Sequence, residues 1–277
     1  MLELEYAGLS EQGPVRDNNE DFIAQHCPAE PDEGLRKGAL FVVADGVGGS
    51  RAGEVASKEA SQRLITCYYQ SARKPQRALQ EAFTQSNLHI CDLGYTHPEY
   101  RRMQTTLTTL TLVDNRVHIG HVGDSRIYRV RRGEIEQLTN DHSEVGELVR
   151  MALITAEEAR HHPRRNIITR TVGGDLLLRP DFRSEPVEAG DIFVLCTDGL
   201  WEPVDEAEIV AATTQSSPAD ACRYLVDLAL ERGSEDNISI QAVKVLALGP
   251  QIAEPAGRTN GLLKRAFRFL GNQEPGR

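Results

Sequence analysis

The chain has 277 residues, of which 40% are hydrophobic and 26% are charged, and its formal net charge at pH 7 is −10. This length can bury a sizeable core, whereas the acidic balance argues against a nucleic-acid backbone as partner. No apolar run approaches the ~20 residues of a membrane span. The five cysteines lack CxxC spacing, and the first residues lack a basic start and an apolar stretch. Composition therefore favours a reduced, cytoplasmic protein without a disulfide framework or a zinc site.

The first half of the chain alternates short apolar runs with two longer amphipathic stretches. Short apolar runs are typical of strands, and apolar side chains repeated every three to four positions predict helices with one face on a sheet. Pro75 suits the first turn of the second helix, while turns at 114–115 and 132–133 divide a β-branched stretch into a four-strand meander. The expected elements are strands at residues 4–10, 21–27 and 39–45, helices at 51–70 and 75–93, and the meander at 105–139.

The second half predicts one helix around residues 143–161, ended before Pro163, and then strands with a second helix pair. Asp205 and Glu208 form a capping box for the first helix of this pair, and Ser217 caps the second. Because strands come in meanders and helices in pairs, the pattern favours antiparallel sheets over a parallel βαβ sheet. The expected strands lie at residues 181–186, 191–197 and 237–246, and Gly233 ends the last helix.

Four aspartates stand where an apolar run ends or begins: Asp45, Asp124, Asp198 and Asp236. Carboxylates gathered at strand ends suit a hard divalent cation such as Mg²⁺ or Mn²⁺, which takes oxygen ligands. Taken alone, each of these sites also fits an ordinary β-turn or a helix cap. The surrounding sequence has to decide between the two interpretations.

That surrounding sequence favours a phosphate site. After Asp45, three glycines in residues 46–49 let the backbone approach a ligand closely before a helix begins. Near the start of the chain, VRDNNED places Arg16 just before the acidic pair Glu20 and Asp21. An arginine can hold a phosphate through two hydrogen bonds, and nearby carboxylates can hold metal-bound waters.

Taken in order, the motifs RxxNED, ADGVGG, GDSR, TDG and EDN closely resemble those of the type 2C metal-dependent protein serine/threonine phosphatases. The resemblance runs from about residue 10 to about residue 245, and the short loop after the ADG motif makes the bacterial single-domain members the most similar. Five motifs in order are far more specific than any one of them. The resemblance implies an α+β four-layer sandwich of two stacked antiparallel β-sheets flanked by α-helix pairs, with the metals at one end.

The resemblance also implies metal ligands, two of the ions being tightly bound Mn²⁺ or Mg²⁺. Asp45 matches the carboxylate that bridges these two metals, and the Gly46 carbonyl matches a further ligand of the first. Asp198 and Asp236 match ligands of the second metal. Asp124 matches the residue that, with Asp198, holds a weaker third metal in bacterial members.

The remaining site residues are carried over in the same way. Arg16 matches the arginine that holds the substrate phosphate, and Glu20 and Asp21 match acidic residues that orient water or touch the metal cluster. Many eukaryotic relatives have a histidine, proposed as the general acid, where this chain has Val47. The general acid is then another side chain or a metal-bound water. His142 is the obvious side chain, although a lone loop histidine is more often solvated.

The activity that the resemblance implies is hydrolysis of phosphoserine and phosphothreonine on proteins by a metal-activated water. The sequence has no GxSxG elbow and no CxxxxxR loop, so no protein nucleophile is expected, and Cys196 is expected to be a buried small hydrophobe. Expected partners are phosphorylated proteins and a cognate cytoplasmic serine/threonine kinase, with no nucleic acid. Two alternatives stay open: a catalytically silent phosphoprotein-binding scaffold of this fold, and a phosphatase of a small anti-sigma-type regulator.

Three segments are expected: a catalytic domain at 1–246, a Pro/Gly/Ala-rich linker at 247–260 and a short basic amphipathic tail at 261–277. Residues 261–271 of the tail could make a weak contact with a membrane or a partner, or dock on their own domain or stay disordered. Residues 141–170 match a mobile flap of bacterial relatives, and an ordinary connecting helix hairpin is the alternative.

Overall fold

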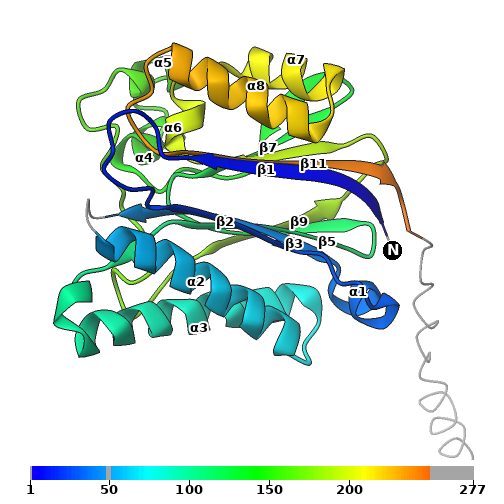
Figure 1. Cartoon of the computed structure of the whole chain (residues 1–277), viewed down its shortest axis with the longest axis horizontal. Coiled ribbons are helices and arrows are strands. Elements are labelled where there is room, and N and C mark those ends of the chain that lie inside the picture. The colour runs from blue at the N-terminus through cyan, green and yellow to red at the C-terminus, as the bar shows by residue number, and fades with distance from the viewer. Residues whose placement is uncertain (1, 48–50, 250–277) are drawn as a thin grey trace, which may run out of the picture.

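The computed structural model describes residues 2–47 and 51–249 and consists of two stacked antiparallel sheets with helices on both outer faces (Figure 1). This confirms the expected α+β sandwich. Residues 48–50 and 250–277 lie outside the described residues. The predictions for the last glycines after Asp45, for most of the linker at 247–260 and for the tail at 261–277 therefore fall outside the described residues.

The strands pair antiparallel throughout each sheet, and the first strand pairs with the last. The first sheet has the order β1 (Glu3–Glu11), β11 (Ile238–Ala247), β10 (Ile192–Cys196), β7 (Arg126–Arg131) and β8 (Glu134–Gln137). The second has the order β2 (Asp21–His26), β3 (Ala39–Val47), β5 (Leu107–Val113), β6 (Arg116–Val122) and β9 (Asp181–Pro186), with β4 (Gln104–Thr105) paired to the end of β3.

Two helix pairs cover the outer faces of the sheets (Figure 1). One pair packs on the second sheet and the other on the first. The pairs are α2 (Arg51–Gln70) with α3 (Pro75–Thr96), and α7 (Glu206–Gln215) with α8 (Pro218–Glu231). The shorter helices are α1 (Pro31–Lys37), η1 (Pro98–Tyr100), α4 (Glu144–Arg150), α5 (Ala156–Arg160) and α6 (Asp198–Trp201).

Side-chain alternation along the central strands divides the core into three apolar layers. In β3, Val42 and Ala44 face the α2–α3 pair. Phe41 and Val43 face the other sheet, and a third layer fills the space between that sheet and the α7–α8 pair. Because successive side chains of a strand point to opposite faces, Asp45 continues the row of Phe41 and Val43 into the space between the sheets.

Most predicted elements are confirmed. Helix α2 has the predicted bounds, and α3 begins at Pro75 as expected but runs to Thr96. The capping box of Asp205 and Glu208 is present in α7, and the Ser217 side chain accepts the backbone N–H of Asp220 at the start of α8. The sequence analysis did not predict the short helices α1 and α6.

The predicted four-strand meander is wrong in its second half. The β5–β6 hairpin belongs to one sheet and the β7–β8 hairpin to the other. Gly123, with a φ of 113°, turns the chain between them, and a Cβ there would overlap the side chain of Thr106. Both predicted turns are nevertheless present, with positive φ at Asp114 and Asn115 and again at Arg132 and Gly133. The crossing between the sheets carries Asp124, which follows Gly123.

The single helix predicted at residues 143–161 is also wrong. The chain forms α4 and α5 instead, separated by a turn in which Ala152 has a φ of 54°. Thr155 and Glu158 form a capping box that starts the second helix, because they satisfy the first free N–H groups locally. Residues 141–170 therefore form a pair of short helices connected by tight turns.

The described fold continues past the predicted end of the catalytic domain at residue 246. Strand β11 ends at Ala247, and Asn115 exchanges two hydrogen bonds with the backbone of Gly249, at 2.9 and 2.8 Å. In the part of the chain that the structure describes, no helix has the length and hydropathy needed to cross a bilayer.

Candidate metal centre

Two aspartates stand directly opposite one another on adjacent strands. In the antiparallel pair of β2 and β3, Asp21 is the register partner of Asp45. Paired residues project to the same face of a sheet, and like charges placed opposite one another are destabilising. Both carboxylates lie on the face turned toward the other sheet, so a counter-charge is needed between the sheets.

The backbone of Asp45 is fixed by two threonines. Its N–H donates to the Thr106 hydroxyl at 2.8 Å, and its carbonyl accepts from the Thr106 N–H and the Thr105 hydroxyl, both at 2.8 Å. These bonds use main-chain groups, so they hold the residue in place without engaging the carboxylate.

The first sheet contributes Asp198 and the crossing between the sheets contributes Asp124. Asp198 is the first residue of α6 and is separated from the end of β10 by Thr197, and Asp124 is only 4% exposed. The Oδ1 atom of each is buried and has no hydrogen-bond partner among residues 2–47 and 51–249. A buried carboxylate oxygen left unpaired is strongly unfavourable. A bound cation would satisfy both atoms.

The four predicted aspartates lie near one another, together with Asp21. Burial raises the pKa of Asp45 well above its usual range, and the negative charges of Asp21, Asp198, Asp124 and Asp236 raise it further. We call these five residues the acidic cluster. Burial and the neighbouring Asp124 and Asp236 raise the pKa of Asp198 in the same way.

Asp21 is held by a threonine at the end of the opposite sheet. The Thr197 hydroxyl donates to Asp21 Oδ2 at 2.8 Å and accepts the backbone N–H of Ser239 at 3.0 Å. Burial raises the pKa of Asp21 to about 7. The structure therefore places Asp21 inside the acidic cluster, whereas the sequence analysis left open whether it orients water or touches the metals.

Gly46 and Glu20 lie against the start of α2. The Gly46 N–H donates to the Glu20 carbonyl at 3.1 Å, and a Cβ on Gly46 would overlap the carbonyl oxygen of Gly53. Only glycine permits this close approach of three backbone segments. A Cβ on Gly53 would in turn meet the Glu20 carboxylate, which places that carboxylate beside the first turn of the helix.

Arg16 and Asp236 form an ion pair with one another. The Arg16 Nη2 atom lies 2.6 Å from Asp236 Oδ2, and the two side chains are 45% and 37% exposed. The resemblance assigned them to different ligands, a phosphate and a metal. Because an exposed ion pair contributes little net stability, this contact can open when a stronger ligand arrives.

The interpretation of His142 as a solvated loop histidine is wrong. Its side chain is fully buried, and its ring Nδ1 accepts the backbone N–H of Gly123 at 3.2 Å. The backbone N–H of His142 donates to the Gly123 carbonyl at 2.7 Å. Its Nε2 lies 3.3 Å from Asp181 Oδ2 and 3.2 Å from Arg170 Nη1. Burial, and then the charge of Arg170, lower its pKa. His142 holds the residue that precedes Asp124 and does not face solvent.

Two further side chains that sequence reasoning missed support the cluster. Asn237 accepts the Glu20 N–H at 2.8 Å and donates to the carbonyls of Gln12 and Asn18, so it ties the loop that carries Arg16 to the EDN motif. Trp201 donates its Nε1–H to the Asp124 carbonyl at 3.1 Å. Asn237 is the last residue of the EDN motif and Trp201 lies two residues after the TDG motif, so nearness to these motifs could have indicated both residues.

The donor set fits a hard divalent cation. All five members of the acidic cluster offer carboxylate oxygens, the ligands that Mg²⁺ and Mn²⁺ prefer. In the described residues, no three acidic, histidine or cysteine side chains already converge closely enough to hold one ion.

Comparison with known proteins gives one consistent result. The family model described as "Protein phosphatase 2C" matches residues 21–228. The chain is similar to protein phosphatase PhpP of Streptococcus pneumoniae, with 36% identity over 248 residues, covering 87% of this chain and 98% of PhpP. It is also similar to serine/threonine protein phosphatase PstP of Mycobacterium tuberculosis, with 36% identity over 88% of this chain and 46% of that protein.

Solved structures agree with the sequence comparison. The crystal structure of the Mycobacterium tuberculosis serine/threonine phosphatase PstP/Ppp matches with a TM-score of 0.78 and 34% identity, covering 88% of this chain and 99% of that one. The PstP catalytic domain in complex with two manganese ions matches with a TM-score of 0.77 and 34% identity, covering 89% and 100%.

The raised pKa values predict that the metal-free protein loses stability as the pH rises. Burial raises the pKa of Asp21 and Asp124 to about 7 from 3.8, so between these values the folded state binds more protons than the unfolded state. The free energy of unfolding should therefore fall from about pH 4 to about pH 7 and then level off, by up to about 1.4 kcal/mol per pH unit for each group. Thermal melts with a chelator measure this slope.

Two comparisons isolate the cause of that slope. Asp124→Asn should melt with a shallower pH dependence than wild type, and excess Mn²⁺ should stabilise wild type most above pH 7. Identical slopes for the variant and wild type in chelator would contradict a role of Asp124 in a mutually repelling cluster.

Proposed function

The chain belongs to the protein phosphatase 2C family and is a metal-dependent protein serine/threonine phosphatase, and on this premise we propose that the acidic cluster holds two divalent cations, Mn²⁺ or Mg²⁺. The observation that carries the proposal is the direct opposition of Asp21 and Asp45 beside the buried, partnerless oxygens of Asp124 and Asp198. Two cations held there would supply hydroxide near neutral pH and neutralise a phosphomonoester.

The proposal gives each member of the cluster a role. The Asp45 carboxylate would hold both cations, and the Gly46 carbonyl would be a further ligand of the first. Asp198 and Asp236 hold the second cation. Asp124, together with Asp198, holds a weaker third one, since a site with fewer carboxylates binds a hard cation less tightly.

Residues around the cluster bind and orient the substrate and water. Arg16, released from Asp236, holds the phosphate oxygens that are not transferred, because a guanidinium matches two such oxygens at once. Glu20, beside the cluster, and Asp21, a member of it, orient water there. Thr197 keeps the Asp21 carboxylate directed between the sheets through its 2.8 Å hydrogen bond.

We do not assign the general acid to His142, because its ring is fully buried and its Nδ1 accepts the backbone N–H of Gly123. Cys196 is fully buried behind Asp198, in keeping with a reaction that uses water and no protein nucleophile. The proposed substrates are phosphoserine and phosphothreonine on cytoplasmic proteins. A serine/threonine kinase must supply such substrates, so the proposed biological role is to oppose one.

The first test of this function is Asp45→Asn. An amide brings no charge and cannot bridge two cations, so Mn²⁺-dependent hydrolysis of a phosphothreonine peptide should fall at least about a hundredfold. The metal-free variant should melt above metal-free wild type, because one repelling charge is gone. Asp227→Asn, an exposed aspartate on α8, is the matched control and should keep wild-type activity.

Retention of a tenth of wild-type activity by Asp45→Asn would remove the bridging role. A wild-type protein that binds the phosphopeptide in Mn²⁺ without hydrolysing it would instead support the silent-scaffold alternative.

The second test is Arg16→Ala, which separates phosphate binding from metal binding. Loss of a charge-assisted contact worth about 1.5–3 kcal/mol should raise KM for p-nitrophenyl phosphate roughly 10- to 150-fold. Mn²⁺ affinity measured by calorimetry should stay the same or increase, because Asp236 loses its ion-pair partner. Arg16→Lys should lie in between, since it keeps the charge but not the two-pronged geometry.

The distant Arg36→Ala, on α1, is the matched control for Arg16→Ala. An unchanged KM together with a lowered melting temperature would give Arg16 a purely structural role.

A further inference from the structure

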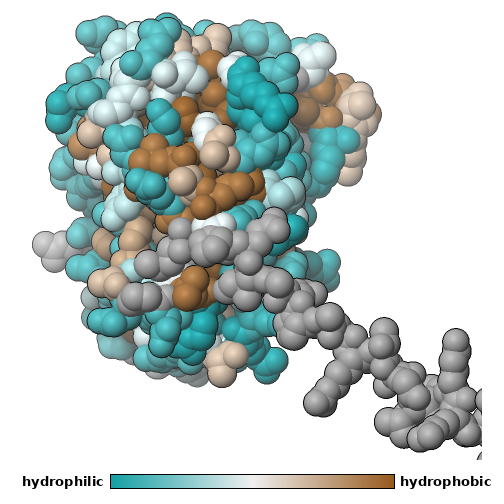
Figure 2. Space-filling model, turned by 90° about the vertical axis from the view of Figure 1, so that its right-hand side faces the viewer, coloured by the Kyte–Doolittle hydropathy of each residue, from teal (hydrophilic) through white to brown (hydrophobic). Residues whose placement is uncertain are grey.

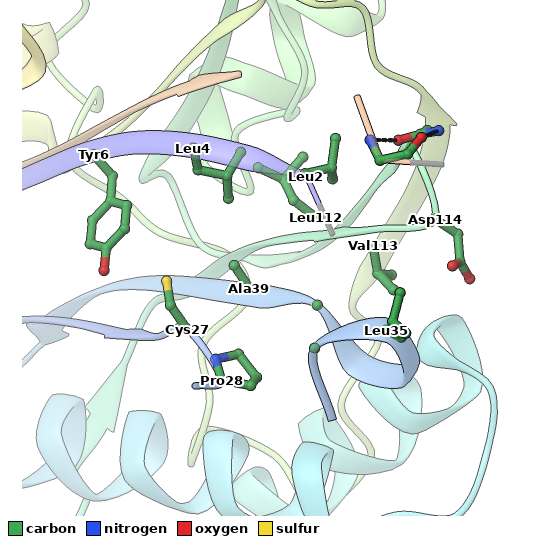
Figure 3. Close-up of a pocket in the computed structure, with 14 residues that line it drawn as sticks. Leu2, Leu4, Tyr6, Cys27, Pro28, Leu35, Ala39, Leu112, Val113 and Asp114 are labelled. Carbon is green, nitrogen blue, oxygen red and sulfur yellow. Dashed lines mark hydrogen bonds between the residues drawn. The ribbon is translucent and has the colours of Figure 1, made fainter. Parts of the chain in front are cut away.

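The end of the sandwich opposite the acidic cluster contains an apolar groove of about 200 Å³. It lies between β1, α1 and the β5–β6 turn (Figure 3). Its large aliphatic lining residues are Leu2, Leu4, Leu35, Leu112 and Val113, joined by the ring of Tyr6. A cavity of about 150 Å³ with such walls can take a benzene molecule, so this one has room for the ring of one phenylalanine.

Apolar side chains remain exposed around the groove. Leu35 is 37% exposed, Tyr6 is 41% exposed and Leu248 is 44% exposed. Figure 2, which looks onto this end of the molecule, shows apolar surface gathered in the middle of the face. A patch of this kind is typical of a surface that another segment or molecule covers.

The chain itself leads from this groove into residues 250–277. Gly249 lines the groove and is fixed there by its two hydrogen bonds with Asn115, at 2.9 and 2.8 Å. The eleven residues 250–260 that follow are rich in Pro, Gly and Ala. Eleven residues of random coil have a root-mean-square span of about 17–20 Å, which would keep residues 261–271 within reach of the groove at an effective concentration in the millimolar range.

The tethered segment matches the groove in apolar character and in charge. Residues 261–271 read GLLKRAFRFLG, and a helical periodicity of 3.6 would put Leu263, Phe267 and Leu270 on one side and the basic residues on the other. Among the described residues that line the groove, Asp114 is the charged one, and α1 carries Asp32 and Glu33 in its first turn and Arg36 and Lys37 in its last. Lys264, Arg265 and Arg268 are the complementary charges.

We propose that residues 261–271 fold back onto their own domain and bury a phenylalanine side chain in this groove. The occupant is the chain's own tail because the groove lies where the described chain ends, the linker is long enough to return, and the charged residue that lines the groove, Asp114, is acidic whereas the segment is basic. A segment of eleven residues is too short to be stable as a free helix, so docking would supply the partner surface it needs.

The first measurement is amide hydrogen exchange of the full-length protein at α1 and residues 112–115. The tail variant Leu263→Glu with Phe267→Glu places charges on the apolar side of the segment and changes no residue of the described domain. Exchange at these sites should become about tenfold faster, the effect of losing 1.4 kcal/mol of protection. The matched control, Thr259→Glu with Asn272→Glu, adds the same charge outside the segment and should exchange like wild type.

The second measurement approaches the contact from the groove side. Leu35→Glu changes an exposed groove side chain, and its melting temperature and p-nitrophenyl phosphate turnover report whether the domain stays folded. Trypsin cleavage after Lys264, Arg265 and Arg268, relative to cleavage after Arg258 in the linker, should become about tenfold faster than in wild type.

Three outcomes would overturn the proposal. Equal exchange rates and equal cleavage ratios in wild type and variants would show that the groove is not covered by the tail. Protection that disappears on roughly a hundredfold dilution would assign the occupant to a second copy of the chain. A tail that trypsin cleaves freely, in a protein that sediments with phosphatidylglycerol vesicles, would assign the segment to a membrane surface.

Discussion

Repulsion among the carboxylates between the two sheets is the constraint on which the functional end of this protein depends. Asp21 and Asp45 are register partners on adjacent strands. Asp124 and Asp198 each add a buried oxygen that has no hydrogen-bond partner in the described part of the chain. Carboxylates in this arrangement oppose folding unless protons or cations neutralise them. Bound positive charge would therefore stabilise this end of the sandwich, and divalent metal ions would supply it.

Neutral side chains hold the acidic cluster in place. Thr197 links Asp21 to the opposite sheet, Asn237 ties the loop before β2 to the EDN motif, and Trp201 and His142 fix the crossing that carries Asp124. The hydrogen bonds of these side chains go to backbone atoms or to a single carboxylate oxygen. They position the chain on both sides of the cluster and leave acidic oxygens available for a ligand.

The sequence was sufficient to predict the acidic residues and most elements, because strand ends and helix caps leave local signals such as Asp205 with Glu208. It was insufficient wherever a contact depends on distant residues. Gly123 sends the chain to the other sheet, and the surrounding turn sequence is equally compatible with a simple meander. His142 is buried because it packs on Gly123, nineteen residues away, and the sequence around His142 does not predict this contact. The ion pair of Arg16 and Asp236 joins residues 220 positions apart in the sequence, so no local pattern could predict it.

Diffraction at the manganese absorption edge, from crystals of the full chain grown with Mn²⁺, tests the central claim most directly. The account predicts two anomalous peaks about 3.5–4 Å apart between the sheets, both contacted by the Asp45 carboxylate, with Asp198 and Asp236 on one of them and Arg16 turned away from Asp236. Anomalous peaks only outside the acidic cluster, or a single peak that does not contact Asp45, would contradict it.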